Sequence, residues 1–262
     1  MSGKTFFLVA LLVCYVIAIP PLVADYYEKT VSVTPSGRVL VNSHYKLRND
    51  APESETPFSR LDYSMSYDEQ QKSIPGMTLI LPMGVSNIKY FDRIGNITSS
   101  SVRAHGEQAV EVSVLFRYPL MGGWKTDLNI TYEMPGHLLA TSGPNHAMQA
   151  TVVDKVVPEI HYKHLVSHVT FPQGSSRTAI DFPEAIGRAP KSHDSVPAFM
   201  DWRPRPRMTV RVDELTNGNS LAPMTVSYFM PTTTRMVQYA GIASIGAMVV
   251  LVLLVIKKLW NM

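Results

Sequence analysis

The chain has 262 residues, with 24 Lys and Arg against 21 Asp and Glu. Three of the basic residues, Lys4, Lys257 and Lys258, lie at the two ends, so the body between them carries equal numbers of both signs. A near-neutral body excludes the basic surface that nucleic-acid binding requires.

An apolar run of fourteen residues, Phe6–Ile19, lies close to the N-terminus. It is short for a membrane span, which needs about 20 residues, but it suits the core of a signal peptide. We therefore expect residues 1–24 to be a signal peptide that is cleaved after Ala24; an uncleaved anchor is the alternative. Cys14, the only cysteine, leaves with this segment, so the mature body has no disulfide.

The body between the two ends is predicted to be built from short strands. Apolar residues alternate with polar ones in many short runs, and no run shows a 3.6-residue period. Gly136–Asn145 and Glu184–Pro206 are predicted loops because turn residues and prolines are frequent there. The fold class is therefore predicted to be all-β, an antiparallel β-sandwich over residues 25–235. The predicted strands are 28–34, 38–47, 61–67, 77–81, 85–91, 108–118, 124–133, 148–157, 164–171, 178–182, 208–212 and 224–229.

The stretch Arg117–Pro135 organises the predicted sheet. We expect Pro119 to end the strand before it, because proline has no donor for a ladder hydrogen bond. A glycine pair then allows the chain to turn beside the large indole of Trp124. This indole is expected either to lie in the core or to contact a partner protein. The structural motif is Gly122, Gly123, Trp124, Lys125 and Thr126.

Two tripeptides have the pattern of N-glycosylation acceptors, Asn96-Ile97-Thr98 and Asn129-Ile130-Thr131. Such patterns arise by chance, and they matter only in a chain that enters the secretory pathway. Asn129 lies inside a predicted strand, so a glycan there would need an exposed face of the sheet.

The motifs of common hydrolases, metalloproteases and nucleotide-binding loops are absent from the sequence. His161, His164 and His168 form the one histidine cluster, with His164 and His168 expected on one strand face and His161 on the other. Solvated strand histidines are the favoured interpretation, and a metal site is the alternative. An aromatic-basic segment at Asp201–Arg203 is either a ligand cradle or an exposed loop. No catalytic residue, metal or cofactor is predicted.

A second apolar run, Met236–Ile256, has twenty-one residues and no charge. As a helix it would cover about 31 Å, the thickness of a bilayer's hydrocarbon core. The lysines that follow it outnumber the single arginine before it, which favours a cytosolic tail at 257–262. We therefore predict one transmembrane helix in a type I protein.

Small residues recur along this predicted helix at spacings that place them on one face. Such a face would let another membrane helix pack closely, although small residues are common in membrane helices in general. The predicted docking residues are Ala240, Ala243, Ser244 and Ala247.

Several segments resemble ribophorin I, a non-catalytic subunit of the oligosaccharyltransferase complex, in content and in order. They include YFDRIGNITSS from Tyr90, RYPLMGGWKTDLNITYEMP from Arg117, VVDKVVPE from Val152 and IDFPEAIGRAP from Ile180. The resemblance covers essentially residues 26–256. Family members have two lumenal domains and a long cytosolic tail, whereas only the second domain and the membrane helix are recognisable here.

The resemblance implies a protein of the endoplasmic-reticulum membrane with its body in the lumen. It implies an accessory role in transferring an oligosaccharide from a dolichol carrier to asparagine, with catalysis in another subunit. The implied partners are the catalytic and accessory subunits and the nascent polypeptide. Asn96 matches the family's acceptor motif, and Asn129 does not. A free-standing type I receptor or adhesion protein is the alternative, and a hydrolase is a third hypothesis.

Overall fold

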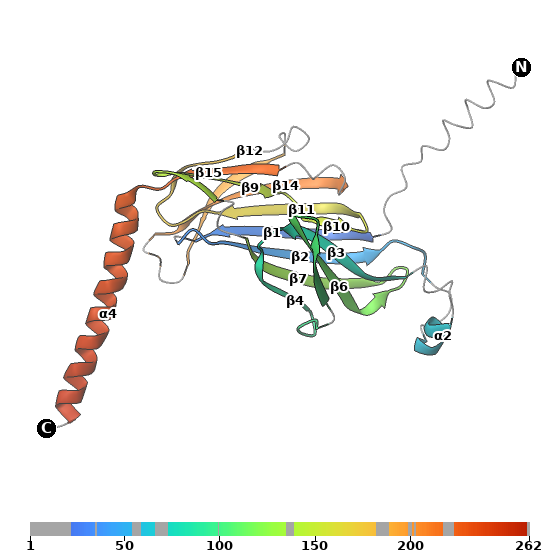
Figure 1. Cartoon of the computed structure of the whole chain (residues 1–262), viewed down its shortest axis with the longest axis horizontal. Helices are drawn as coiled ribbons and strands as arrows, with labels where there is room; N and C mark the ends of the chain where they lie inside the picture. Colours follow the sequence, from blue (N-terminus) through green and yellow to red (C-terminus); the bar gives the residue numbers. More distant parts are fainter. Residues whose placement is uncertain are drawn as a thin grey trace, which may run out of the picture.

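The computed structural model describes residues 22–34, 36–53, 59–65, 73–98, 100–134, 139–181, 189–198, 201, 203–216 and 223–260. Within these residues the body is built almost wholly from strands, and one long helix follows it (Figure 1). The elements are β1 (Leu22–Val33), β2 (Val39–Asn49), α2 (Arg60–Met65), β3 (Ile74–Pro82), β4 (Ser86–Asp92), β5 (Ser100–His105), β6 (Ala109–Leu120), β7 (Lys125–Met134), β8 (Leu139–Ser142), β9 (Asn145–Thr151), β10 (Lys155–Val157), β11 (Ile160–Thr170), β12 (Ser176–Asp181), β13 (Lys191–Val196), β14 (Arg205–Thr216), β15 (Pro223–Phe229) and α4 (Thr232–Trp260).

The strands form three sheets. Sheet A has the order β13-β14-β11-β1-β2-β7-β4, sheet B the order β10-β3-β6-β5, and sheet C the order β12-β15-β9-β8. The all-β prediction is confirmed, but a purely antiparallel fold is not, because β1 and β11 pair in parallel. The two strands are far apart in the chain, so no local turn signal marks their pairing.

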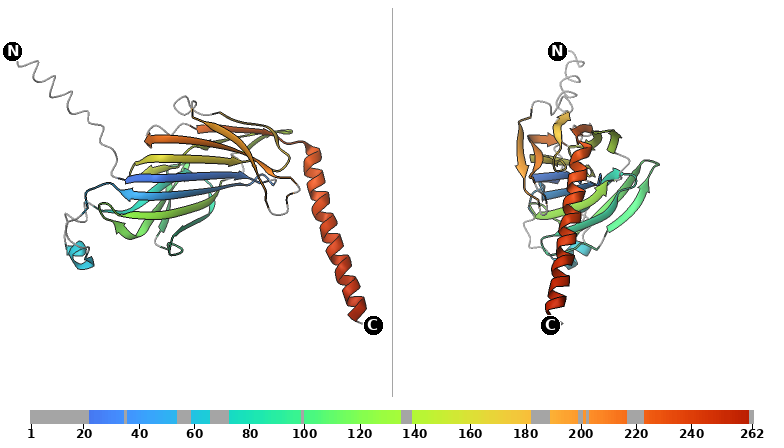
Figure 2. Two further views of the ribbon diagram at one scale, coloured as in Figure 1. Left: turned by 180° about the vertical axis from the view of Figure 1, so that it is seen from behind. Right: turned by 90° about the vertical axis from the view of Figure 1, so that its left-hand side faces the viewer.

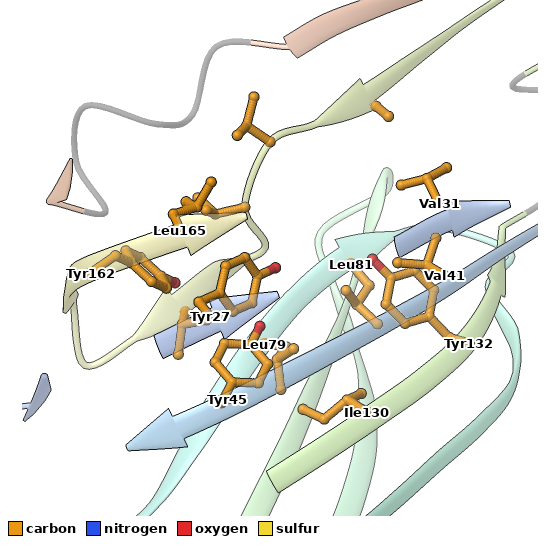
Figure 3. Packing of buried hydrophobic residues seen from close by; sticks show 14 of the residues in the cluster. Tyr27, Val31, Val41, Tyr45, Leu79, Leu81, Ile130, Tyr132, Tyr162 and Leu165 are labelled. Carbon is orange, nitrogen blue, oxygen red and sulfur yellow. The ribbon is translucent and has the colours of Figure 1, made fainter. Parts of the chain in front are cut away.

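One face of sheet A packs against sheets B and C around a common core. Buried side chains from all three sheets belong to one hydrophobic cluster. Four tyrosines, Tyr27, Tyr45, Tyr132 and Tyr162, stand on this inner face (Figure 3) and are at most 4% exposed. The opposite, outer face of sheet A carries half-buried and exposed polar residues, as the alternating burial of β1 and β2 shows. This alternation is the pattern of a sheet with one packed and one solvated face.

Residues 61–65 form part of the short helix α2 and not the predicted strand. The amide of Tyr63 donates to the carbonyl of Ser59 at 3.0 Å, which is a helical bond. Met65, in the predicted strand, is 78% exposed. Alternating apolar residues over so few positions do not distinguish a strand from a helical turn that lies on the surface.

Pro119 does not end β6, which continues to Leu120. Gly76 of β3 pairs with Leu115 and Ile74 with Leu120, so the register breaks between these pairs and residues 116–119 have no partner in β3. The proline lies in this irregular stretch, where its missing amide hydrogen costs no ladder bond.

Both predicted loops contain strands. β8 lies inside 136–145 and forms a hairpin with β9, which begins at Asn145; residues 135–138 lie outside the described part. β13 lies inside 184–206 and is an edge strand of sheet A. Its sequence, KSHDSV, is exposed almost throughout. An edge strand with no buried face shows no alternation, so periodicity could not find it.

β1 begins at Leu22, three residues before the predicted start of the mature chain. Leu22, Val23 and Ala24 are at most 1% exposed and pair with β11 and with β2. These three residues are therefore part of the core of sheet A.

The helix α4 follows β15 and extends away from the β-body, as two further views show (Figure 2). Its apolar side chains from Ile245 to Ile256 are exposed. Within the part of the chain that the structure describes, no helix meets the combined length and hydropathy requirements of a membrane span.

Candidate functional site

The glycine pair makes a tight turn between β6 and β7. The amide of Trp124 donates to the carbonyl of Met121 at 3.0 Å, and Gly123 has a φ of +75°. A Cβ atom on Gly122 would lie 1.9 Å from the carbonyl oxygen of Pro52. Glycine is therefore required at 123 by the backbone angle and at 122 by the close approach of another segment.

The indole of Trp124 is 38% exposed, so the expectation that it lies in the core is wrong. The backbone around it is what holds the turn: Gly123 donates to the carbonyl of Asn49 at 2.8 Å, and Asn49 donates to the carbonyl of Trp124 at 3.1 Å. The side chain of Asn49, fully buried, also donates to the carbonyl of Leu120 at 2.9 Å and accepts from Ala51 at 3.0 Å. The buried anchor of this motif is thus an asparagine on β2 that sequence reasoning missed.

The rest of the GGWKT motif lies at the surface of sheet A. Lys125 is exposed, with its ammonium 3.8 Å from a carboxylate oxygen of Asp25, and Thr126 is half-buried. Trp124 and Lys125 are therefore exposed on a turn whose backbone is hydrogen-bonded to β2.

The acceptor Asn96 is exposed in the turn after β4. Asp92 orders this turn by accepting hydrogen bonds from the amides of Ile94 and Gly95, both at 2.9 Å. Arg117 bonds the same carboxylate at 2.8 and 3.1 Å, and this guanidinium lowers the pKa of Asp92 to about 2. Asn96 is thus exposed on a turn that Asp92 and Arg117 hold in place.

The acceptor Asn129 lies in the middle of sheet A. It is half-buried in β7, opposite His44 of β2 and Phe91 of β4. The residues that follow and precede it, Ile130 and Leu128, point into the core, so Asn129 points to the outer face.

Among the residues that the structure describes, the most deeply buried charges are Lys29 and Asp154, whose side chains are 2% and 1% exposed. The Lys29 ammonium donates to Asp154 Oδ1 at 2.7 Å and to the carbonyl and hydroxyl of Thr151 at 2.9 and 3.2 Å. These three bonds use all three of its protons.

Asp154 accepts four more hydrogen bonds, all from hydroxyl groups. Ser43 donates at 2.7 Å, Tyr132 at 2.8 Å, Tyr45 at 3.2 Å and Tyr27 at 3.4 Å. Five donors therefore surround one carboxylate and tie β1, β2 and β7 of sheet A to the segment between β9 and β10.

Burial alone would raise the pKa of Asp154. The Lys29 ammonium and the hydrogen bonds from Lys29, Ser43 and Tyr132 overcome burial and hold the pKa below its usual value. Burial also raises the pKa of Tyr132 well above 10, and the neighbouring Asp154 charge adds to this. The carboxylate therefore stays charged and the phenol stays neutral at physiological pH.

A cavity of about 380 Å³ lies beside this cluster, where the three sheets meet. Val31, Leu81 and Ala150 are among its apolar walls, and Lys29 and Asp154 line it too. One sequence signal could have found the cluster: Lys29 occupies an inner-face position between Tyr27 and Val31, where a charge needs a buried partner.

The three histidines of β11 pair with separate acidic residues. His161 Nε2 lies 2.6 Å from Glu214, His164 Nδ1 2.8 Å from Asp213, and His168 Nε2 3.5 Å from Glu28. Among the described residues, no group of three His, Cys, Asp or Glu side chains is placed to hold a metal ion.

The expected facing of the histidines does not hold. Two residues, not one, lie between the inward-facing Tyr162 and Leu165, so the strict alternation of the strand is broken there. His161 is therefore half-buried on the outer side like His168, and His164 is exposed. Burial lowers the pKa of His168, and the neighbouring Glu28 opposes this effect.

The predicted cradle around Asp201 is only partly described, because Trp202 lies outside the described residues. The side chain of Asp201 is 6% exposed and accepts from Arg205 Nε at 2.5 Å. Asp201 is thus neutralised by Arg205, and this ion pair stabilises the segment that contains both residues.

The four small residues of α4 are exposed. The hydroxyl of Ser244 donates to the carbonyl of Gly241 within the helix at 2.8 Å.

These features define an all-β domain held by a saturated buried ion pair, carrying two surface glycan acceptor sequences and followed by a long helix. The chain belongs to the ribophorin I family, whose sequence model matches residues 4–257.

Among curated proteins, the chain is similar to subunit 1 of dolichyl-diphosphooligosaccharide–protein glycosyltransferase from Caenorhabditis elegans. The two are 32% identical over 184 residues, which cover 70% of this chain and 31% of the relative. Subunit 1B from rice is 29% identical over 169 residues, covering 60% of this chain and 33% of that protein. The chain thus spans about a third of the length of these relatives.

Solved structures resemble the chain only distantly. A putative protease from Parabacteroides distasonis aligns with a TM-score of 0.44 and 10% identity, covering 82% of this chain and 41% of that one. A zinc metallopeptidase from Deinococcus radiodurans aligns with a TM-score of 0.39 and 11% identity, covering 80% and 42%. Likeness at this level carries no argument about function.

Proposed function

We propose that this chain is a non-catalytic accessory subunit of an oligosaccharyltransferase complex in the endoplasmic-reticulum membrane. The observation that carries the proposal is the ribophorin I family match over residues 4–257. The names of the relatives, which are subunit 1 of this glycosyltransferase in nematode and plants, support it.

An accessory role fits the chemistry of the described body. Its most buried carboxylate, Asp154, is saturated by five donors, so it has no role left for proton transfer. The three histidines of β11 each bond to an acidic or hydroxyl side chain of a neighbouring strand. These groups stabilise the sandwich, and catalysis is assigned to another subunit.

We further propose a single-pass type I topology, with the β-body in the lumen. The support is the charge-free run Met236–Ile256, the exposed apolar side chains of α4 and the apolar run near the N-terminus. In this arrangement Ala240, Ala243, Ser244 and Ala247 dock α4 against a helix of the complex. The proposed partners are the catalytic and accessory subunits, and nascent polypeptide passing the lumenal body.

The test is to purify the detergent-solubilised complex through a tag on this chain and to identify the copurifying proteins by mass spectrometry. The catalytic subunit is expected in near-stoichiometric amount, and the recovered complex should glycosylate an acceptor peptide while this chain alone should not. Recovery of the chain alone, with surface labelling of intact cells and complex-type glycans, would support a free-standing receptor instead.

A further inference from the structure

The second acceptor sequence lies on the open side of sheet A. Along β7 the core positions are Ile130, fully buried, and Tyr132, 4% exposed, so Asn129, Thr131 and Glu133 alternate onto the outer face. The asparagine and the threonine of this acceptor sequence therefore face the same side.

Strand register shows what surrounds them. Thr131 lies opposite Asn42 of β2 and Lys89 of β4, and Asn42 lies opposite Thr30 of β1. Glu133, about 7 Å further along the strand, begins the next row of outer-face residues. Asn129 lies about 7 Å away in the opposite direction, directly next to the row of Thr131.

Thr131, Glu133 and the residues paired with them on the neighbouring strands line a shallow groove of about 640 Å³. This volume lies within the range of ordinary small-molecule sites. Five amide and hydroxyl side chains contribute to the lining, together with three charged residues and three apolar or aromatic ones: Asn42, Asn87, Thr30, Ser32 and Thr131; Arg38, Lys89 and Glu133; and Leu40, Val41 and Tyr132.

The carboxylate of Glu133 is held in place at the edge of the groove. Arg38 donates to one oxygen at 3.1 Å and Asn87 to the other at 2.5 Å, and the residue is 8% exposed. Each oxygen has a second lone pair, so the carboxylate can still accept from a ligand hydroxyl. Leu40, 43% exposed, adds one apolar contact to the lining.

This lining suits a polyhydroxylated ligand. Sugar hydroxyls both donate and accept, as amide side chains do, and a carboxylate accepts from pairs of them. The exposed Leu40 can meet the C–H face of a sugar ring. The amide, hydroxyl and carboxylate groups of the groove stand on paired strands, so little conformational entropy is lost when a ligand binds them.

We propose that the inner sugars of an N-linked glycan on Asn129 lie in this groove, so that sheet A binds its own carbohydrate. In the other direction along β7 lie charged side chains that already have partners: Arg93, 81% exposed, pairs with Asp127 at 3.2 Å, and Lys46 lies over the ring of Tyr26. The groove instead offers the glycan amide and hydroxyl side chains. Asn96, exposed in a turn, has its glycan in solvent. The inference rests on the lumenal placement proposed above.

The experiment uses the full chain, purified in detergent from eukaryotic membranes. Mass spectrometry of glycopeptides measures occupancy at Asn96 and Asn129, and endoglycosidase H is then applied to the native protein. Release from Asn129 is expected to be about tenfold slower than from Asn96, which corresponds to about 1.4 kcal/mol of packing free energy. The two rates should become equal after denaturation.

Variants of the groove distinguish binding of the glycan in the groove from steric hindrance of endoglycosidase H near Asn129. The double variant Asn42→Ala, Lys89→Ala should speed native release from Asn129 toward the rate at Asn96. The control Lys125→Ala, on the same face of β7 and outside the groove, should leave the slow release unchanged.

Three results would overturn the inference: no glycan on Asn129, equal native release at both sites, or unchanged release in the double variant. A glycan on Asn96 with none on Asn129 would leave the lumenal placement intact. Absence of glycan at both sites would overturn the inference alone, because such acceptor patterns also arise by chance. The copurification experiment tests the proposed accessory role separately, so its result does not depend on the glycan measurements.

Discussion

Lys29 Nζ lies 2.7 Å from Asp154 Oδ1, and neither side chain reaches solvent. This pair links the central strand of sheet A to the segment that connects sheet C with sheet B. Because every proton of the ammonium is bonded and the carboxylate has five donors, the charges are solvated by the protein itself.

Removing one charge of this pair should destabilise the domain strongly. Lys29→Met leaves Asp154 buried without its cation, and the expected loss is about 3–5 kcal/mol in urea denaturation. The double variant Lys29→Met, Asp154→Asn should lose less than the sum of the single variants. Lys163→Met, which removes a surface cation 3.6 Å from Asp25, is the control and should cost at most about 1 kcal/mol. A small effect of Lys29→Met would show that the pair is not a major contributor.

Acid should weaken the turn that carries Asn96. The folded-state pKa of Asp92 is about 2, below its ordinary value of 3.8. A lowered pKa means that Asp92 contributes stability above pH 3.8, and that this contribution is lost as pH falls from about 4 through about 2. Thermal unfolding of the parent and of Asp92→Asn should therefore differ at pH 6 and converge near pH 2. A difference that is constant over this range would contradict the pKa argument.

The GGWKT motif should be more sensitive at its glycines than at its tryptophan. Gly122→Ala places a methyl group against the Pro52 carbonyl and should cost about 3 kcal/mol through overpacking. Trp124→Ala removes a side chain that is 38% exposed, so it should lose only part of the about 3–5 kcal/mol that a fully buried aromatic loses on truncation, about 2 kcal/mol. Chemical denaturation of the two variants checks the order. A larger loss for Trp124→Ala than for Gly122→Ala would show that the indole contributes to the core.

Blocking the small-residue face of α4 should weaken assembly without unfolding the β-body. Ala243→Leu with Ala247→Leu adds bulk where close helix packing is proposed, so less catalytic subunit should copurify. Circular dichroism of the lumenal body should stay unchanged. Val249→Ala, on the opposite face of the same helix, is the matched control. Equal recovery from parent and double variant would remove this docking face.

The mature chain should keep Leu22, Val23 and Ala24. All three are buried and paired in β1, so a cut after Ala24 would remove core residues from the central strand. N-terminal sequencing of the purified protein should therefore begin at or before Leu22. A mature chain that begins at Asp25 would show that β1 tolerates this loss.

The sequence by itself determined the local features of this protein. Alternation found most strands of the sandwich, including Val110, Val112 and Val114 of β6, because a strand with one buried face must repeat every two residues. The ordered motifs indicated the ribophorin I family, and the family match confirms it. Both acceptor tripeptides were also readable, because such a motif is defined by three adjacent residues.

Only the tertiary structure decided what depends on residues far apart in the chain. Lys29 and Asp154 meet across 125 residues, and β1 meets β11 in parallel; no local pattern encodes either contact. The same holds for Trp124, whose exposure follows from how its turn rests on Asn49 and Pro52. Alternation records which residues are apolar, but burial and ion pairing depend on which strands become neighbours, and that is decided when the three sheets close over one core.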